Sequence, residues 1–154
     1  MPAIDIVSDA SVALKWFHAE GEEEVPEARA LVAAHQVRTV ALQVLDLTAY
    51  EVGNALLRGR AKATANQVAA VLGALAEICP AAQPDPDELR LAAELADRHD
   101  LTLYDAAYAA VAENRRATLA TLDRALLKAG LGRRPSEVAE ELAPPRTPKP
   151  RKPR

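Results

Sequence analysis

The chain has 154 residues, of which 49% are hydrophobic and 27% are charged, and its formal net charge is −3. This composition is that of one globular domain with a sizeable core. It excludes a helix that spans a bilayer, because no run of about 20 apolar residues is present. Aromatic residues make up only 3%, so Ala, Leu and Val must build the core, which favours helices packed on a small sheet.

Positive charge is concentrated at the C-terminal end. Residues 144–154 hold five Lys or Arg, five Pro and no acid. We expect a folded domain over residues 1–143 and a disordered, basic, Pro-rich tail over residues 144–154. The domain itself is then more acidic than the whole chain, so contact with a polyanion requires local basic groups or a bridging metal ion.

Cys79 is the only cysteine, which excludes an internal disulfide and a thiolate zinc cluster and favours a small core residue. The N-terminal sequence MPAIDIVSDA lacks the basic region and the long apolar stretch of a secretion signal. We therefore expect a cytoplasmic protein that does not enter a membrane.

Short apolar runs alternate with amphipathic runs along the chain. We expect strands at residues 3–8, 37–42 and 118–122, with room for at most a very short strand in CPAAQPDPDEL. Helical segments are expected at residues 11–17, 26–35, 46 or 48 to 58, 64–78, 86–98, 102–115, 123–130 and 135–142. This alternation predicts an α/β fold in which helices cover both faces of a short, mainly parallel sheet.

Four acids occur on segments that otherwise resemble a buried core: Asp9, Glu51, Asp105 and Asp123. None has a Lys or Arg three or four residues further on, the usual partner on a helix. An unpaired ionised carboxylate in a core costs several kcal/mol or more. Four such acids therefore indicate one shared site that a divalent cation fills.

Each acid also has a structural explanation. Asp9 and Asp123 can cap the helices that follow them, and Asp105 can close a capping box that begins at Thr102. Glu51 has no capping duty, because it is expected inside a helix, but it can face solvent. The cap explanations are compatible with metal binding.

The expected topology favours a shared site. Ligands of a parallel sheet bind beyond the carboxyl ends of its strands. Two of the acids follow expected strands and two lie near helix starts, so all four tend toward one rim. Clustered carboxylates repel one another unless a cation neutralises them, and oxygen ligands suit Mg²⁺ or Mn²⁺. Ser11 is expected to support Asp9 through its hydroxyl, and Thr121 to support Asp123.

Four sequence blocks also resemble a known family. DAS at residues 9–11, EVGNAL at 51–56, LTLYDAAYAA at 101–110 and LATLDRAL at 119–126 are similar to the signature blocks of PIN-domain ribonucleases. The similarity is greatest to the VapC toxins of bacterial type II toxin–antitoxin pairs. It covers about residues 4–127. Two regions depart from the family pattern: residues 81–85 leave little room for a third strand, and residues 131–143 predict a turn and a helix where the family has another strand.

This resemblance implies a PIN-like three-layer α/β/α sandwich with a site that cleaves RNA. By the resemblance, Asp9, Glu51, Asp105 and Asp123 are the catalytic, metal-binding acids, with Ser11 in support. The implied cofactor is Mg²⁺ or Mn²⁺. A metal-activated water would hydrolyse the phosphodiester bond and leave a 5′-phosphate and a 3′-hydroxyl.

The resemblance also implies partners: an RNA substrate, a VapB-type antitoxin that brings Arg or Lys to the acids, and a second copy of the chain. For the homodimer, the expected pairing surface is the apolar stripe of Ala28, Leu31 and Val32. Two rival functions stay open, namely a catalytically silent PIN-like module that binds RNA or protein, and a DNA flap nuclease or phosphatase. Lys15 and Arg58 are expected either to contact phosphate or to be simply solvated.

Overall fold

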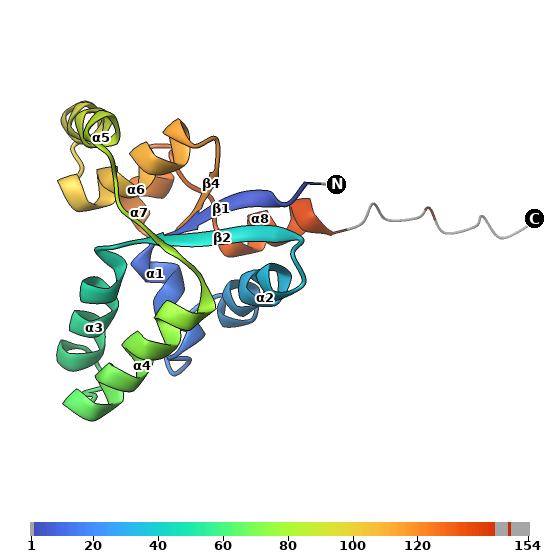
Figure 1. The fold of residues 1–154 in the computed structure, drawn as a ribbon, viewed down its shortest axis with the longest axis vertical. Helices are drawn as coiled ribbons and strands as arrows, with labels where there is room; N and C mark the ends of the chain where they lie inside the picture. The colour runs from blue at the N-terminus through green and yellow to red at the C-terminus, as the bar shows by residue number, and fades with distance from the viewer. Residues whose placement is uncertain (1, 144–147, 149–154) are drawn as a thin grey trace, which may run out of the picture.

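The computed structural model describes residues 2–143 and Pro148. Strands and helices alternate along this part of the chain (Figure 1). The strands are β1 (Ile4–Ser8), β2 (Val40–Leu45), β3 (Ala81–Ala82) and β4 (Thr118–Ala120). The helices are α1 (Ala10–Ala13), the 3₁₀ turn η1 (Leu14–Trp16), α2 (Val25–Gln36), α3 (Thr48–Arg58), α4 (Ala65–Ile78), α5 (Pro86–His99), α6 (Leu103–Asn114), α7 (Arg124–Lys128) and α8 (Pro135–Leu142).

The four strands form one parallel sheet in the order β3-β2-β1-β4. Ile6 in β1 is in register with Leu42 in β2 and with Thr118 in β4. The carboxyl ends of β1 and β2 point away from the N-terminus, toward α3 and α6 (Figure 1). In a parallel sheet this end is where ligands bind, so the topology defines the rim at which a site is expected.

Helices cover both faces of the sheet. Successive residues of a strand point to opposite faces, and β1 shows this directly: Ile6 belongs to one core and Val7 to the other. The first core is covered by α1, α2, α3, α4 and α8, and the second by α5, α6 and α7. The predicted three-layer α/β/α sandwich, with a parallel sheet, is thereby confirmed.

Strand β2 is displaced from the predicted residues 37–42 to Val40–Leu45. Val37 ends α2 and is 73% exposed, and Arg38 has a φ of 62° in the left-handed region. The chain therefore turns at these two residues before it enters the sheet. The β-branched Val37 favoured a strand locally, but the turn that closes α2 decides the conformation.

In the two regions that depart from the family pattern, strand pairing at the edges of the sheet is short. β3 has only two residues, as the sequence predicts. Near residues 131–143, a single parallel bridge between Ala120 and Arg133 precedes α8, which has its predicted bounds. The disordered tail predicted for residues 144–154 lies outside the described residues, apart from Pro148, and it stays a prediction together with the domain boundary at 143.

The stripe on α2 that we expected to pair two copies is buried within the monomer. Ala28 and Leu31 are 0% and 1% exposed, and they belong to the core between α2 and β2. Trp16 packs on the same core, and its Nε1–H donates to the carbonyl of Ala28 at 3.0 Å. The pairing surface predicted from this stripe is therefore wrong. Within residues 2–143, no helix has both the length and the apolar character needed to cross a membrane.

Candidate active site

Asp9 lies directly beyond the carboxyl end of β1, with only 3% of its surface exposed. Its backbone N–H donates to the carbonyl of Ala120 at 3.2 Å, which continues the pairing of β1 with β4. Its Oδ1 accepts a hydrogen bond from the N–H of Val12 at 3.2 Å and so caps α1. The capping role that the sequence allowed is present, but it occupies only part of the carboxylate.

Two hydroxyl groups also hold Asp9. Ser11 Oγ donates to Oδ1 at 2.5 Å, and the Thr121 hydroxyl donates to Oδ2. These hydroxyls in turn accept hydrogen bonds from the N–H groups of Leu122, at 2.9 Å, and Asp123, at 3.0 Å. The predicted contact of Ser11 is confirmed. The predicted contact of Thr121 is wrong, because β4 lies beside β1 and places this hydroxyl on Asp9 rather than on the carboxylate of Asp123.

Burial raises the pKa of Asp9 from 3.8 to about 6, even though the hydrogen bonds from Ser11, Thr121 and Val12 act in the opposite direction. The negative charge of Asp123 adds to the rise. Among the described residues, no Lys or Arg forms a salt bridge with Asp9. Asp9 is therefore a buried carboxylate whose charge the protein does not itself neutralise.

Glu51 comes from the first turn of α3 and is half-buried. Burial raises its pKa, and the charges of Asp105 and Asp123 raise it further. The hydroxyl of Tyr108 donates to Glu51 Oε1 at 2.9 Å and partly offsets this rise. Glu51 is therefore partly buried rather than fully solvated.

Tyr108 is a residue of the site that the sequence analysis missed. It is 1% exposed on α6, one turn after Asp105, and its hydroxyl lies 2.7 Å from Thr48 Oγ1. Burial, with the charges of Glu51 and Asp9, raises the pKa of Tyr108, so the phenol stays protonated. Its one sequence signal was a hydroxyl on an otherwise alanine-rich buried helix, where it needs a partner.

Asp105 is the third residue of α6. Its N–H donates to Thr102 Oγ1 at 3.1 Å, so the predicted N-cap is confirmed. Within the described chain, the reciprocal hydrogen bond from the N–H of Thr102 to the Asp105 carboxylate is not formed, unlike in the complete capping boxes of α4 and α5. Burial raises the pKa of Asp105, the charge of Asp123 adds to the rise, and the side chain of the N-cap Thr102 partly offsets it. The cap therefore does not compensate for the burial of this carboxylate.

Asp123 follows β4 and caps α7, since its Oδ1 accepts a hydrogen bond from the N–H of Leu126 at 3.0 Å. Its charge raises the pKa of Asp9, of Glu51 and of Asp105. It is thus the common neighbour of the other three acids. Strands β1 and β4 and helices α3 and α6 bring all four predicted acids to one rim.

The donor chemistry of this rim fits a hard divalent cation. Every acid supplies carboxylate oxygens, and the pKa shifts show that the acids repel one another. Among the described residues, no three His, Cys, Asp or Glu side chains are already arranged as ligands of one ion. Both oxygens of Asp9 accept hydrogen bonds instead. The roles of the acids as metal ligands stay a prediction.

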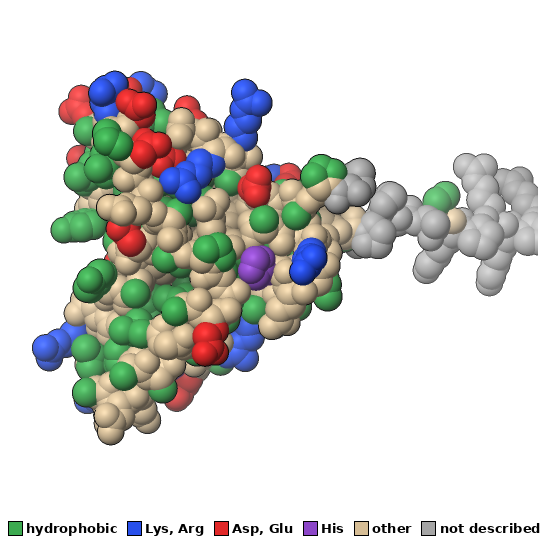
Figure 2. Space-filling model, in the orientation of Figure 1, with side chains coloured by type: hydrophobic (Ala, Val, Ile, Leu, Met, Phe, Trp, Pro, Cys, Tyr) green, Lys and Arg blue, Asp and Glu red, His purple; other side chains and the backbone are tan. Residues whose placement is uncertain are grey.

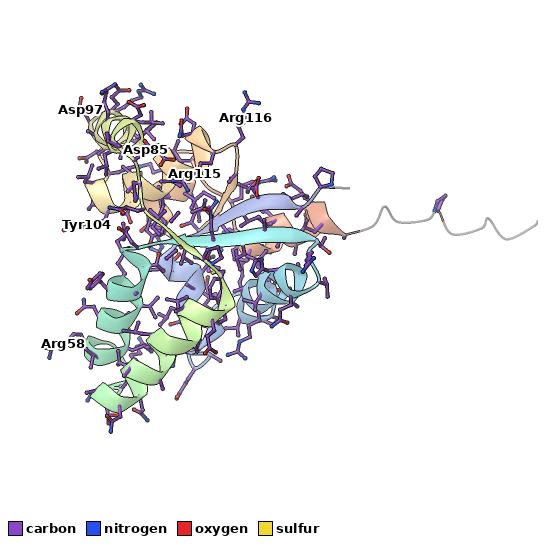
Figure 3. All side chains as sticks on the ribbon, in the orientation of Figure 1. Arg58, Asp85, Asp97, Tyr104, Arg115 and Arg116 are labelled. Atoms are coloured by element: carbon purple, nitrogen blue, oxygen red, sulfur yellow. The ribbon has the colours of Figure 1, made fainter. Side chains whose placement is uncertain are left out.

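An open apolar groove adjoins the acids. It has a volume of about 900 Å³ and is lined by Glu51 together with residues of α3 and α4 and Tyr104 of α6, among them Asn54, Leu57 and Leu72. Hydrophobic side chains border the hollow between α3 and α6 and continue over α4 (Figure 2). Tyr104, which is 67% exposed, projects from this rim (Figure 3). The groove thus exposes large apolar side chains directly beside Glu51.

The two basic side chains singled out in the sequence differ in their environments. Lys15 is 5% exposed and donates to Glu22, so the prediction that it is solvated is wrong. Arg58 extends from the outer end of α3 (Figure 3) and is exposed. Within the described chain, neither side chain forms an ion pair with any of the four acids.

Comparisons with known proteins agree with this fold and rim. The sequence profile of the PIN domain matches residues 6–131. Ribonuclease VapC3 of Pyrobaculum aerophilum is 36% identical over 125 residues, which cover 79% of this chain and 91% of that protein. The crystal structure of PAE2754 from the same organism superposes with a TM-score of 0.66 and 26% identity, over 91% of this chain and 97% of the other.

A second solved structure, a toxin–antitoxin complex from Klebsiella pneumoniae, has the same fold. Its TM-score is 0.62 and its identity 18%, with coverage of 84% of this chain and 97% of the other. The chain therefore belongs to the PIN-domain family. Within that family it is of the VapC type, as its four sequence blocks predict.

Proposed function

We propose that this chain is an endoribonuclease that depends on a divalent cation, and that it is the toxin of a toxin–antitoxin pair. One observation carries the proposal: the buried Asp9 forms no salt bridge with a described Lys or Arg, and it lies near Asp123, whose charge also raises the pKa of Glu51 and of Asp105. Such perturbed carboxylates are concentrated at functional sites. The 36% identity to Ribonuclease VapC3 supports RNA as the substrate.

The four acids would hold Mg²⁺ or Mn²⁺ at the carboxyl edge of the sheet. When bound, the cation would neutralise the carboxylates, polarise the scissile phosphate and activate a water molecule for attack. Ser11 and Thr121 keep Asp9 in one orientation, which removes the need to order it when substrate binds. Glu51 and Asp105 are more exposed than Asp9, and Glu51 lines the open groove beside the site.

Cleavage assays test the enzymatic part of the proposal. Purified protein should cut single-stranded RNA with Mg²⁺ or Mn²⁺, stop when EDTA is added, and leave 5′-phosphate and 3′-hydroxyl ends. Single-stranded DNA, flapped DNA and a small phosphate ester should stay intact under the same conditions. Cleavage of DNA alone would support the flap nuclease, and no cleavage of any substrate would support the silent module.

Growth assays test the toxin part. Expression of the wild-type chain in a bacterium without an antitoxin should arrest growth. Expression of Asp9→Asn at the same protein level should not. An enzyme of this kind would act on RNA in the cytoplasm, in line with the location expected from the sequence. Equal growth of the two cultures would show that the chain is not a toxin in that host.

For the antitoxin, we propose the groove beside Glu51 as the docking site. Its exposed apolar wall suits the nonpolar face of a helical peptide, and an Arg or Lys from that peptide would pair with Glu51 or Asp105. Replacing Leu57 with Glu in this wall should weaken inhibition by the antitoxin and leave cleavage by the free enzyme. Unchanged inhibition would place the antitoxin elsewhere.

We also propose a homodimer, through a surface other than the α2 stripe. Leu89 on α5 and Leu103 on α6 are 47% and 51% exposed, and they border a second hollow of about 240 Å³. A twofold axis through this surface would bury both pairs at once. Light scattering of the wild type at tens of micromolar should give twice the mass of one chain. The Leu89→Glu variant should give the mass of a single chain. A monomeric wild type would remove the dimer.

A further inference from the structure

The hydroxyl of Tyr108 connects the two helical layers at the site. Tyr108 belongs to the core on the α5–α6 face, whereas Glu51 projects from α3 on the opposite face of the sheet. The phenol passes beyond the end of β2 and reaches both Thr48 and Glu51 of α3. Thr48 and Glu51 are one turn apart on α3, just as Asp105 and Tyr108 are on α6.

The hydrogen bonds of this connection run in one direction. The N–H of Leu45, the last residue of β2, donates to Thr48 Oγ1 at 3.1 Å. An ionised Glu51 can only accept, so the proton of Tyr108 is directed at Oε1. The remaining proton, that of Thr48, must then point to the oxygen of Tyr108. The chain of donors therefore starts in the sheet and ends on the Glu51 carboxylate.

The Glu51 carboxylate depends on this series of hydrogen bonds more than the Asp9 carboxylate depends on any one donor. Asp9 receives hydrogen bonds from Ser11, from Thr121 and from a backbone N–H. The Glu51 carboxylate accepts a hydrogen bond from Tyr108 alone among the described residues. A glutamate has several rotatable bonds, and ordering it has an entropic cost. Without the phenol, nothing else in the described chain would hold its carboxylate in one rotamer.

We propose that Tyr108, oriented by Thr48, is a positioning residue that fixes the Glu51 carboxylate relative to Asp105. The proposal rests on the function proposed above and deepens it. Tyr108 is buried and cannot touch RNA, so it acts through Glu51 and not on the substrate. It sets the separation of acids that belong to different layers of the sandwich. Removing a group that orients a metal-binding side chain typically lowers metal affinity or activity 10- to 100-fold.

Tyr108→Phe tests the proposal, because it keeps the ring in the core and removes only the hydroxyl. We expect kcat for RNA cleavage to fall about 10- to 100-fold with KM little changed, and the Kd for Mn²⁺, measured by calorimetry without RNA, to rise by a similar factor. Thr48→Ser keeps the donor and should resemble the wild type. The double variant Thr48→Val with Tyr108→Phe should bind Mn²⁺ as tightly as the single variant Tyr108→Phe.

Trp16→Phe is the control for a merely structural effect. It also removes one buried hydrogen bond, that of Nε1 to the carbonyl of Ala28 on α2, which involves none of the four acids. It should lower the melting temperature and leave kcat and Mn²⁺ affinity unchanged. Wild-type kcat and Mn²⁺ affinity in Tyr108→Phe, alongside an inactive Asp9→Asn, would overturn the positioning role and leave the nuclease standing. A wild type that neither binds Mn²⁺ nor cleaves RNA would overturn both.

Discussion

Two buried carboxylates in this protein have nearly equal exposure and opposite behaviour. Glu88 on α5 is 1% exposed and Asp9 is 3% exposed. The guanidinium of Arg115 donates to both oxygens of Glu88 at 2.8 Å, and these hydrogen bonds lower the pKa of Glu88 from 4.5 to about 2. Asp9 has hydroxyl and N–H donors but no salt bridge with a described Lys or Arg, and burial raises its pKa to about 6.

The difference shows how burial alone fails to identify a functional acid. Glu88 has its own cation, and with Asp85 it forms a complete capping box at the start of α5. Arg115 lies near Asp85 at the same end of the helix pair (Figure 3). The ion pair joins α5 to the end of α6 and neutralises the charge of Glu88. At the rim of Asp9, Glu51, Asp105 and Asp123, by contrast, no described Lys or Arg forms a salt bridge with any acid, and this difference is what makes the rim the candidate site.

The largest effect on stability is expected when Arg115, the cation that pairs with Glu88, is replaced. Arg115→Met leaves a buried carboxylate unpaired, which typically costs about 3 to 5 kcal/mol. The neighbouring Arg116 is exposed and points away from the helix pair (Figure 3), so Arg116→Met should change the free energy of unfolding by less than about 0.5 kcal/mol. Urea unfolding of both variants measures this. Equal losses would mean that the Glu88 pair does not stabilise the fold.

The next effect separates the two acids by activity. Asp9→Asn should lower RNA cleavage by roughly 100- to 1,000-fold, the range for loss of one electrostatic group in an active site. Glu88→Gln should lower stability but keep cleavage at the wild-type rate when assayed well below its melting temperature. A Glu88→Gln variant as inactive as Asp9→Asn would remove the functional contrast between the two carboxylates.

Sequence reasoning found the four acids and the contact of Ser11 with Asp9, but not the contacts that join distant parts of the chain. Local spacing showed that Asp9 and Glu51 lack a helical partner. The partners that they do have, Thr121 and Tyr108, are 112 and 57 residues away and come together only through the sheet and its layers. Glu88 has no partner three or four residues on either, since its cation lies 27 residues further along the chain. A tertiary contact of this kind leaves no trace in spacing.

The fold was more accessible than the contacts. The bounds of α8 and the start of α5 were predicted correctly, because Pro135 and Pro86 mark helix beginnings. The stripe of Ala28 and Leu31 was assigned to the wrong surface, because an apolar stripe does not reveal whether the sheet or a second copy covers it. Here the strand β2 and Trp16 cover it.

Acid pH should weaken the Glu88 region. Its folded-state pKa, about 2, lies below the ordinary value of 4.5, so its stabilisation is complete above pH 4.5 and is lost as the pH falls toward 2. The pKa difference corresponds to roughly 3 kcal/mol. The gap in unfolding free energy between wild type and Arg115→Met should therefore shrink over this range. A gap that stays constant would show that Glu88 is not the group involved.

The smallest effect concerns Asp9 without metal. Its raised pKa means that the ionised form destabilises the fold at neutral pH, and this cost is relieved only as the pH falls below about 6. Asp9→Asn removes the charge but also the charge-assisted hydrogen bonds from Ser11 and Thr121. In EDTA at neutral pH we expect a net gain of about 1 kcal/mol in the free energy of unfolding. A clear loss would mean that hydrogen bonding outweighs burial at this position.

Whether the four acids form one cation site is tested most directly by thermal unfolding with and without Mn²⁺. The comparison needs only the wild type and the double variant Asp9→Asn with Asp105→Asn. Mn²⁺ should raise the melting temperature of the wild type, because binding occurs only in the folded state. The double variant should melt higher than the wild type in EDTA and gain nothing from Mn²⁺. Equal shifts in the two proteins would contradict a shared site.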